Sequence, residues 1–236
     1  VLTETKADIR ELLDLPDAYE IFFMGGGGTL QFSCVPYNFL TAGKVAAYAD
    51  TGSFADKAFE EAEKAGQAVK VFSSKESRYD RVPRPEEIHL PENCAYLHIT
   101  GNNTIEGTEY FAYPETGSVP LIADMSSEIL SRPFPVEKFS LIYGGAQKNI
   151  GPAGVVLVIA RRDFVCLLYT SDAAACLCYL YRRKSGKMAE KTGRLSGHGK
   201  NQPGESGVVV RNGGCSSGFL SGACGQSQSF HYECNF

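Results

Sequence analysis

The segment FSLIYGGAQKNIGPAGVVLVIA, residues 139–160, contains two apolar runs separated by a glycine-rich loop that holds one lysine. Both runs, Phe139–Tyr143 and Val155–Ala160, have the length and apolar content of buried strands. Similar strand patterns alternate with helical patterns from Leu2 to about Asp163. This alternation predicts an α/β domain with a mostly parallel sheet.

The other expected elements all precede this segment. Apolar residues at helical spacing predict one helix over Leu2–Leu13, and a second is expected from the glycines at 25–28 through Leu40. Ser53 is expected to cap a further helix, which ends at Gly66. Short apolar runs predict the remaining strands, at Tyr19–Met24, Lys44–Asp50, Tyr96–Thr100 and Val119–Asp124.

The charge and composition of the 236-residue chain argue against some classes of partner. A net charge of −4 at pH 7 gives no basic surface of the kind that contacts with a phosphate backbone require, so nucleic acid is not expected as a partner. No apolar run approaches the roughly 20 residues that cross a bilayer, and the first helical pattern is amphipathic rather than that of a signal peptide. We therefore expect a cytoplasmic protein with no membrane partner.

The sequence changes character after about Phe164. Residues 186–236 are rich in glycine and serine and show no helix or strand period, and six of the eight cysteines lie between Cys166 and Cys234. Two interpretations remain open: a disordered tail, or a segment translated out of frame or from a foreign insert. We expect a partial domain over 1–163 and an aberrant or disordered tail over 164–236.

One lysine is a candidate catalytic residue. Lys148 lies among small residues, between the two apolar runs of 139–160. Its amine would emerge at the sheet edge into a tight, partly desolvated site, which favours covalent bonding to a carbonyl group. The alternative is a solvated lysine in a loop.

Two further features lie where strands are expected to end. Asp124 ends an apolar run, and the carboxyl edge of the sheet is where α/β proteins bind ligands; the alternative role for Asp124 is a helix N-cap. The glycine run Gly25–Gly28 follows a strand and precedes a helix, where backbone N–H groups can bind a phosphate. It lacks the Lys-Ser/Thr ending of a P-loop, so a tight structural turn is the alternative.

Other groups of residues give no support for a metal site or a hydrolase. The four histidines form no cluster with ligand spacing, and the pair Cys176 and Cys178 lacks a second pair, which argues against zinc. No nucleophile elbow is present. The chain is therefore expected to bind no metal.

Several segments, in order along the chain, resemble the phosphoserine aminotransferase family. Residues 122–154 resemble the region of the family's cofactor-binding lysine, and GAQKNIGPAG at 145–154 is close to diagnostic. GGGGTLQFSCVPYNFL (25–40) resembles the phosphate-binding loop, DTGSFA (50–55) the ring-stacking segment and HITGNNTIEG (98–107) the segment beside the cofactor's hydroxyl. The resemblance covers about residues 3–163. It implies the three-layer, mostly parallel sheet of the large domain of transferases that depend on pyridoxal 5'-phosphate (PLP).

The resemblance also implies a role for each site residue. Lys148 would attach PLP and, once freed, act as general base and acid, while Asp124 would pair with the protonated ring nitrogen. The remaining cofactor-binding residues would be Gly28, Thr29 and Gln147 at the phosphate, Thr104 at the ring hydroxyl and Phe54 at the ring face. The family commonly has Trp at that face, and this chain has no Trp, so stacking on Phe54 should be weaker.

By resemblance, the reaction is the exchange of an amino group between phosphoserine and 2-oxoglutarate, giving 3-phosphohydroxypyruvate and glutamate in serine biosynthesis. The family forms homodimers with sites at the subunit interface. Its N-terminal substrate-binding arginine, partner-subunit loop and small C-terminal domain are not recognisable in this sequence. Three alternatives stay open: an inactive truncated PLP-binding domain, another fold-type I PLP enzyme, and a plain nucleotide-binding Rossmann domain, which the glycine spacing disfavours.

Overall fold

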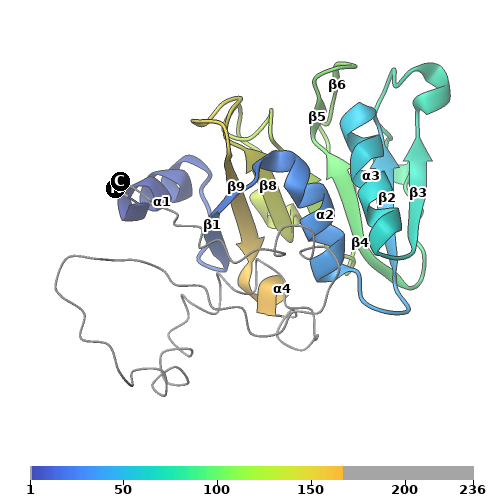
Figure 1. Cartoon of the computed structure of the whole chain (residues 1–236), viewed down its shortest axis with the longest axis horizontal. Helices are drawn as coiled ribbons and strands as arrows, with labels where there is room; N and C mark the ends of the chain where they lie inside the picture. Colours follow the sequence, from blue (N-terminus) through green and yellow to red (C-terminus); the bar gives the residue numbers. More distant parts are fainter. Residues whose placement is uncertain (1, 167–236) are drawn as a thin grey trace, which may run out of the picture. The chain divides into compact units, whose positions relative to one another are not determined.

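The computed structural model describes residues 2–166, and one mixed sheet organises this part of the chain (Figure 1). Its seven strands lie in the order β1 (Tyr19–Gly25), β9 (Val155–Arg161), β8 (Leu141–Gly145), β7 (Leu121–Asp124), β4 (Cys94–Thr100), β2 (Val45–Asp50) and β3 (Ala68–Ser73). Strand β9 is antiparallel to both β1 and β8, whereas all other neighbours are parallel. The predicted mostly parallel α/β sheet is confirmed.

Side chains along the strands alternate between the two faces of the sheet. The helices of the described residues are α1 (Leu2–Leu12), α2 (Gly27–Phe39), α3 (Ser53–Ala65) and α4 (Arg162–Cys166), and none of them is long and apolar enough to cross a membrane. Tyr48 and Tyr96 belong to the layer that packs with α2, α3 and α4, and Figure 1 shows α2 and α3 lying across this face. Their neighbours Ala47 and Leu97 pack on the opposite side, with α1 and the largely irregular segment 74–93. The sheet is thus the middle of three layers, as the family resemblance implies.

The structure contains elements that the sequence pattern did not indicate. β3 forms an edge of the sheet, and Lys70 interrupts its apolar pattern because the lysine pairs with carboxylates of β2 and α3. A short hairpin of β5 (Asn102–Asn103) and β6 (Thr108–Glu109) follows β4. Three 3₁₀ helices cover Lys75–Ser77, Pro85–Glu87 and Val136–Lys138. These additions surround the predicted core without changing it.

The boundaries of some elements differ from the prediction. The strands predicted at 119–124 and 139–143 each begin two residues later. The predicted cap at Ser53 is wrong by one position, because Ser53 is the first residue of α3 and Gly52 occupies the N-cap. The predicted end of this helix at Gly66 is confirmed, since Gly66 is its C-cap.

The described part of the chain ends in α4, which packs against α2. The ring of Phe164 stacks on that of Phe39 with centroids 4.4 Å apart, and Val165 is fully buried. The expected division between residues 163 and 164 stays a prediction. The expectation for residues 167–236 lies outside the described residues.

The carboxyl ends of the strands that run in the common direction meet at one edge of the sheet. Strands β1, β2, β4, β7 and β8 end there with Gly25, Asp50, Thr100, Asp124 and Gly145. Ligands of open α/β sheets bind outside this edge. The segments that leave these strands are therefore where a site is expected.

Candidate active site

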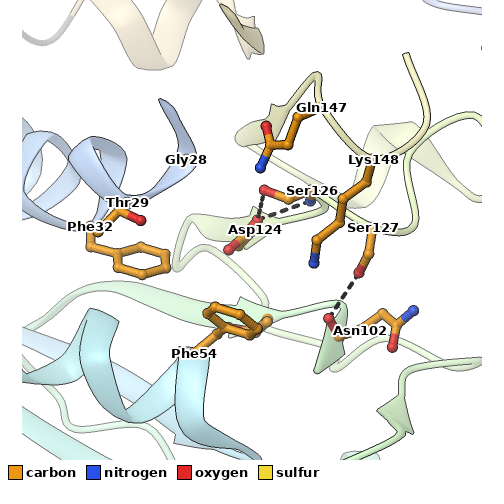
Figure 2. A pocket seen from close by; sticks show the side chains of 11 residues that line it. Gly28, Thr29, Phe32, Phe54, Asn102, Asp124, Ser126, Ser127, Gln147 and Lys148 are labelled. Atoms are coloured by element: carbon orange, nitrogen blue, oxygen red, sulfur yellow. Dashed lines mark hydrogen bonds between the residues drawn. The ribbon is translucent and has the colours of Figure 1, made fainter. Parts of the chain in front are cut away.

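A pocket opens at this edge of the sheet (Figure 2). Its empty volume, open solvent included, is about 470 Å³. It is lined by Gly28, Thr29, Phe32, Phe54, Thr100, Asn102, Asp124, Ser126, Ser127, Gln147 and Lys148. Every site residue predicted from the sequence lies in this lining except Thr104. The fold thus brings together residues that are far apart in the chain.

Asp124 places a carboxylate at the floor of the pocket. Its Oδ1 accepts hydrogen bonds from the backbone N (2.9 Å) and the Oγ (2.6 Å) of Ser126. No described residue donates to Oδ2, so this oxygen is left to accept from a ligand. Burial raises the pKa of the Asp124 carboxyl, while the bonds from Ser126 and the charge of Lys148 oppose that rise. The helix N-cap alternative fails because the residues after Asp124 form turns rather than a helix.

Ser126 fixes the orientation of this carboxylate and ties it to the neighbouring strand. Its Oγ donates to Asp124 and accepts a hydrogen bond of 2.9 Å from the backbone N of Gly145, at the end of β8. The same oxygen lies 3.0 Å from where a Cβ at Gly28 would stand. A glycine at position 28 therefore lets the first turn of α2 approach the carboxylate.

Lys148 directs its amine into the pocket from the loop after β8 (Figure 2). Its Nζ donates to the Oγ1 of Thr104 over 3.2 Å and lies 5.1 Å from the centroid of the Phe54 ring. Thr104 thus stands at the rim, in contact with the lysine but outside the lining. Lys148 is exposed in the single chain, so the expectation of a partly desolvated lysine is wrong for the chain by itself.

The start of α2 faces the pocket with its backbone groups open. Gly26 is the N-cap, and both Gly26 (φ 99°) and Gly27 (φ 72°) have left-handed backbone conformations that favour glycine. No side chain of the cap bonds to the first turn, in which Gly28 and Thr29 line the pocket. Free N–H groups and the positive end of the helix dipole make this end suitable for an anion.

Several lining residues had no signal in the sequence. Ser127 donates through Oγ to the backbone O of Asn102 over 3.0 Å and so joins the segments after β7 and β4. The Oγ1 of Thr100 is buried without a partner among the described residues. Only the order of strands in the sheet brings these groups to the pocket. Ser126 did have a signal, since a serine two residues after an aspartate commonly closes a side-chain turn.

Comparison with known proteins places the chain in a family. The class-V aminotransferase family matches residues 1–171. The chain therefore belongs to the class-V aminotransferases. Membership excludes the plain nucleotide-binding Rossmann domain that the sequence had left open.

Two relatives within this family that resemble the chain carry the same name. The phosphoserine aminotransferase of Geobacillus kaustophilus (strain HTA426) is 52% identical over 160 residues, which are 68% of this chain and 44% of the relative. That of Niallia circulans is 50% identical over 165 residues, which are 70% of this chain and 46% of the relative. The chain thus spans less than half the length of these relatives.

Solved structures agree with the sequence comparison. Phosphoserine aminotransferase from Bacillus circulans subsp. alkalophilus matches with a TM-score of 0.68 and 50% identity, over 70% of this chain and 45% of that chain. The PLP-bound phosphoserine aminotransferase from Trichomonas vaginalis matches with a TM-score of 0.63 and 30% identity, over 81% of this chain and 59% of that chain. The fold described above thus has counterparts in proteins of this name.

Proposed function

We propose that this chain forms the cofactor-binding part of a phosphoserine aminotransferase that uses PLP. The whole protein would exchange an amino group between phosphoserine and 2-oxoglutarate in serine biosynthesis. The observation that carries the proposal is the convergence of Asp124 and Lys148, from the ends of the adjacent parallel strands β7 and β8, on one pocket. The names of the relatives supply phosphoserine, and the resemblance to the family supplies 2-oxoglutarate.

The residues of the pocket fit PLP. Asp124 keeps Oδ2 available as an acceptor for the ring N–H, and the open start of α2 suits the phosphate. Gly28 supports this fit, because a side chain there would press on Ser126. Phe54 offers a ring face near Lys148, whose amine contacts Thr104, the residue expected at the ring hydroxyl.

The proposed roles of the side chains follow from these positions. When bound, PLP withdraws electrons from the substrate Cα, and a protonated ring nitrogen strengthens this effect. Asp124, held by Ser126, keeps a proton on that nitrogen through its charge. Lys148 Nζ attaches the cofactor and, when displaced, is placed to move a proton at the substrate Cα.

The assembly and location of the whole protein are part of the proposal. A homodimer with sites at the subunit interface is consistent with the exposure of Lys148, since a second subunit would cover an otherwise open pocket. The small-molecule substrates fit a cytoplasmic enzyme that contacts neither nucleic acid nor membrane.

The proposal is tested by locating the covalent attachment. The 236-residue chain is incubated with PLP, reduced with borohydride and mapped by peptide mass spectrometry. The reduced adduct is expected on Lys148, and Lys148→Ala should abolish it. Lys57→Ala is the matched control, because Lys57 Nζ lies 5.7 Å from the same Phe54 ring. An adduct on Lys57, or none on Lys148, would sink the assignment.

A further inference from the structure

The start of α3 has no capping side chain of its own. Gly52 is the N-cap and carries no acceptor for the N–H groups of the first turn. The backbone at Gly52 is extended, so its conformation does not call for glycine. Steric crowding, however, does require glycine here. A Cβ at Gly52 would stand 2.6 Å from the Cβ of Asn103 and would overlap the rest of that side chain. A serine or aspartate cap is therefore excluded at this position.

A distant carboxylate supplies the missing cap. Glu106, in the turn between β5 and β6, accepts a hydrogen bond of 3.0 Å through Oε1 from the backbone N of Ser53. The Oγ of Ser53 donates to the same oxygen. The positive end of the helix dipole stabilises a carboxylate at this place. Glu106 thus performs across the structure the task that a local N-cap residue performs elsewhere.

The hairpin that carries Glu106 is also bound to the segment before the helix. Asn103 donates through Nδ2 to the Oγ1 of Thr51 over 3.0 Å, and Thr108 donates through Oγ1 to the backbone O of Thr51 over 2.7 Å. The hairpin and the segment 50–54 therefore form one hydrogen-bonded unit. Phe54, the second residue of α3, belongs to this unit and presents its ring to the pocket.

We propose that Glu106 is a positioning residue of the active site, which holds the Phe54 ring at the pocket by capping α3 from the β5–β6 turn. The proposal rests on the proposed function in so far as the positioned ring serves PLP. Glu106 itself does not line the pocket. Its effect on a ligand is exerted through the start of α3.

The test uses the absence of tryptophan from the chain. In the full chain, Phe54→Trp introduces a single tryptophan at the position in question, and its emission can be excited apart from that of the 12 tyrosines. Glu106→Ala in this background removes the acceptor and is expected to shift the emission of the ligand-free protein to longer wavelength and to increase its quenching by acrylamide. Glu106→Gln keeps an acceptor oxygen and is expected to retain the parent emission. Ile105→Ala, a truncation of an exposed side chain in the same turn, is the matched control.

A PLP titration of the same proteins separates this inference from the proposed function. Loss of the cap is expected to weaken PLP binding about fivefold in Glu106→Ala and to leave it unchanged in Ile105→Ala. Circular dichroism verifies that each variant is folded. Unchanged emission and quenching in Glu106→Ala, or equal changes in Ile105→Ala, would overturn the positioning role. An emission shift without PLP binding by any variant would support the cap and count against the proposed function.

Discussion

The two helices that begin beside the pocket differ in how their first turns are satisfied. Helix α2 begins with glycines, has no side-chain cap and exposes its first turn to the pocket. Helix α3 also begins after a glycine, but Glu106 occupies its start. Both ends carry the same partial positive charge. The protein therefore places its own carboxylate at the start of α3 and leaves the start of α2 open to an anionic ligand.

The two carboxylates near the pocket show the same division. Glu106 holds α3 through Oε1, and its Oε2 is buried without a partner among the described residues, whereas Asp124 lines the pocket and has no described donor to Oδ2. A group that a protein leaves unpaired in a buried place costs stability. An unpaired acceptor that also lines a pocket marks where a ligand is expected to bind. Three substitutions sharpen this comparison.

Closing the open helix start is expected to have the largest effect. Gly28→Val brings a branched side chain against Ser126 Oγ, which already lies 3.0 Å from the position of a Cβ. We expect PLP affinity to fall about 100-fold, the equivalent of one to two charge-assisted hydrogen bonds. Equilibrium titration with PLP measures this loss. Gly43→Val is the control, because Gly43 lies away from the pocket lining and has open space around it. Its left-handed φ adds strain, so any loss there should appear in stability rather than affinity.

Giving α3 a local cap is expected to destabilise the protein rather than stabilise it. Gly52→Ser supplies a hydroxyl at the N-cap, yet its Cβ collides with Asn103. We expect a loss of about 1–3 kcal/mol in the free energy of unfolding, typical of overpacking. Asn103→Gly removes the Cβ and the amide that form the obstacle, so Gly52→Ser should cost less in that background. An equal cost in both backgrounds, measured by urea denaturation, would show that the collision is not the cause.

Neutralising the Asp124 carboxylate is expected to have the smallest effect of the three. The direction of the change in the free energy of unfolding is what distinguishes the possibilities. The pKa of Asp124 is raised by burial in the folded protein, so its contribution to stability is present at low pH and is lost as pH rises through the folded pKa. Asp124→Asn should therefore make the ligand-free protein more stable at neutral pH, with the gain disappearing in acid. Urea denaturation across pH measures the difference.

Asp56 in the first turn of α3 provides a control of opposite sign. Burial raises the pKa of Asp56, but hydrogen bonds from Lys70 and Lys75 outweigh burial and lower it. Its stabilising contribution is present at neutral pH and is lost as pH falls through the folded pKa. Asp56→Asn should thus destabilise the protein at neutral pH. Destabilisation by both substitutions would contradict the distinction between paired and unpaired carboxylates.

Much of this arrangement was accessible from the sequence, because the central strands are short apolar runs. Within the apolar run Val155–Ala160, residues 156–160 are buried on both faces of the sheet, and this pattern is typical of a central strand. The edge strand β3 was missed because, within residues 2–166, it has a neighbouring strand on one side only, and because Lys70 breaks its apolar pattern. An edge strand is half-exposed and has a weaker signal.

The site was predicted where motifs mark the ends of strands and missed where only three-dimensional contacts define it. Asp124 and Lys148 follow apolar runs, so their positions at the sheet edge could be inferred. The cap that Glu106 provides could not be inferred from the sequence. It depends on the close approach of Gly52 and Asn103 in the folded chain, which no local pattern encodes. The Ser53 prediction failed for the same reason: the usual local cap was assumed where a distant one acts.

The antiparallel strand β9 has a consequence for the order in which the protein is assembled. Among the described residues, β1 has β9 as its single neighbour in the sheet, and the glycines at the start of α2 directly follow β1. A ribosome that adds about 5–20 residues per second needs several seconds between the two strands. During that interval β1 lacks the strand with which it pairs in the sheet. The strand that leads into the first segment of the pocket is thus synthesised early and paired late.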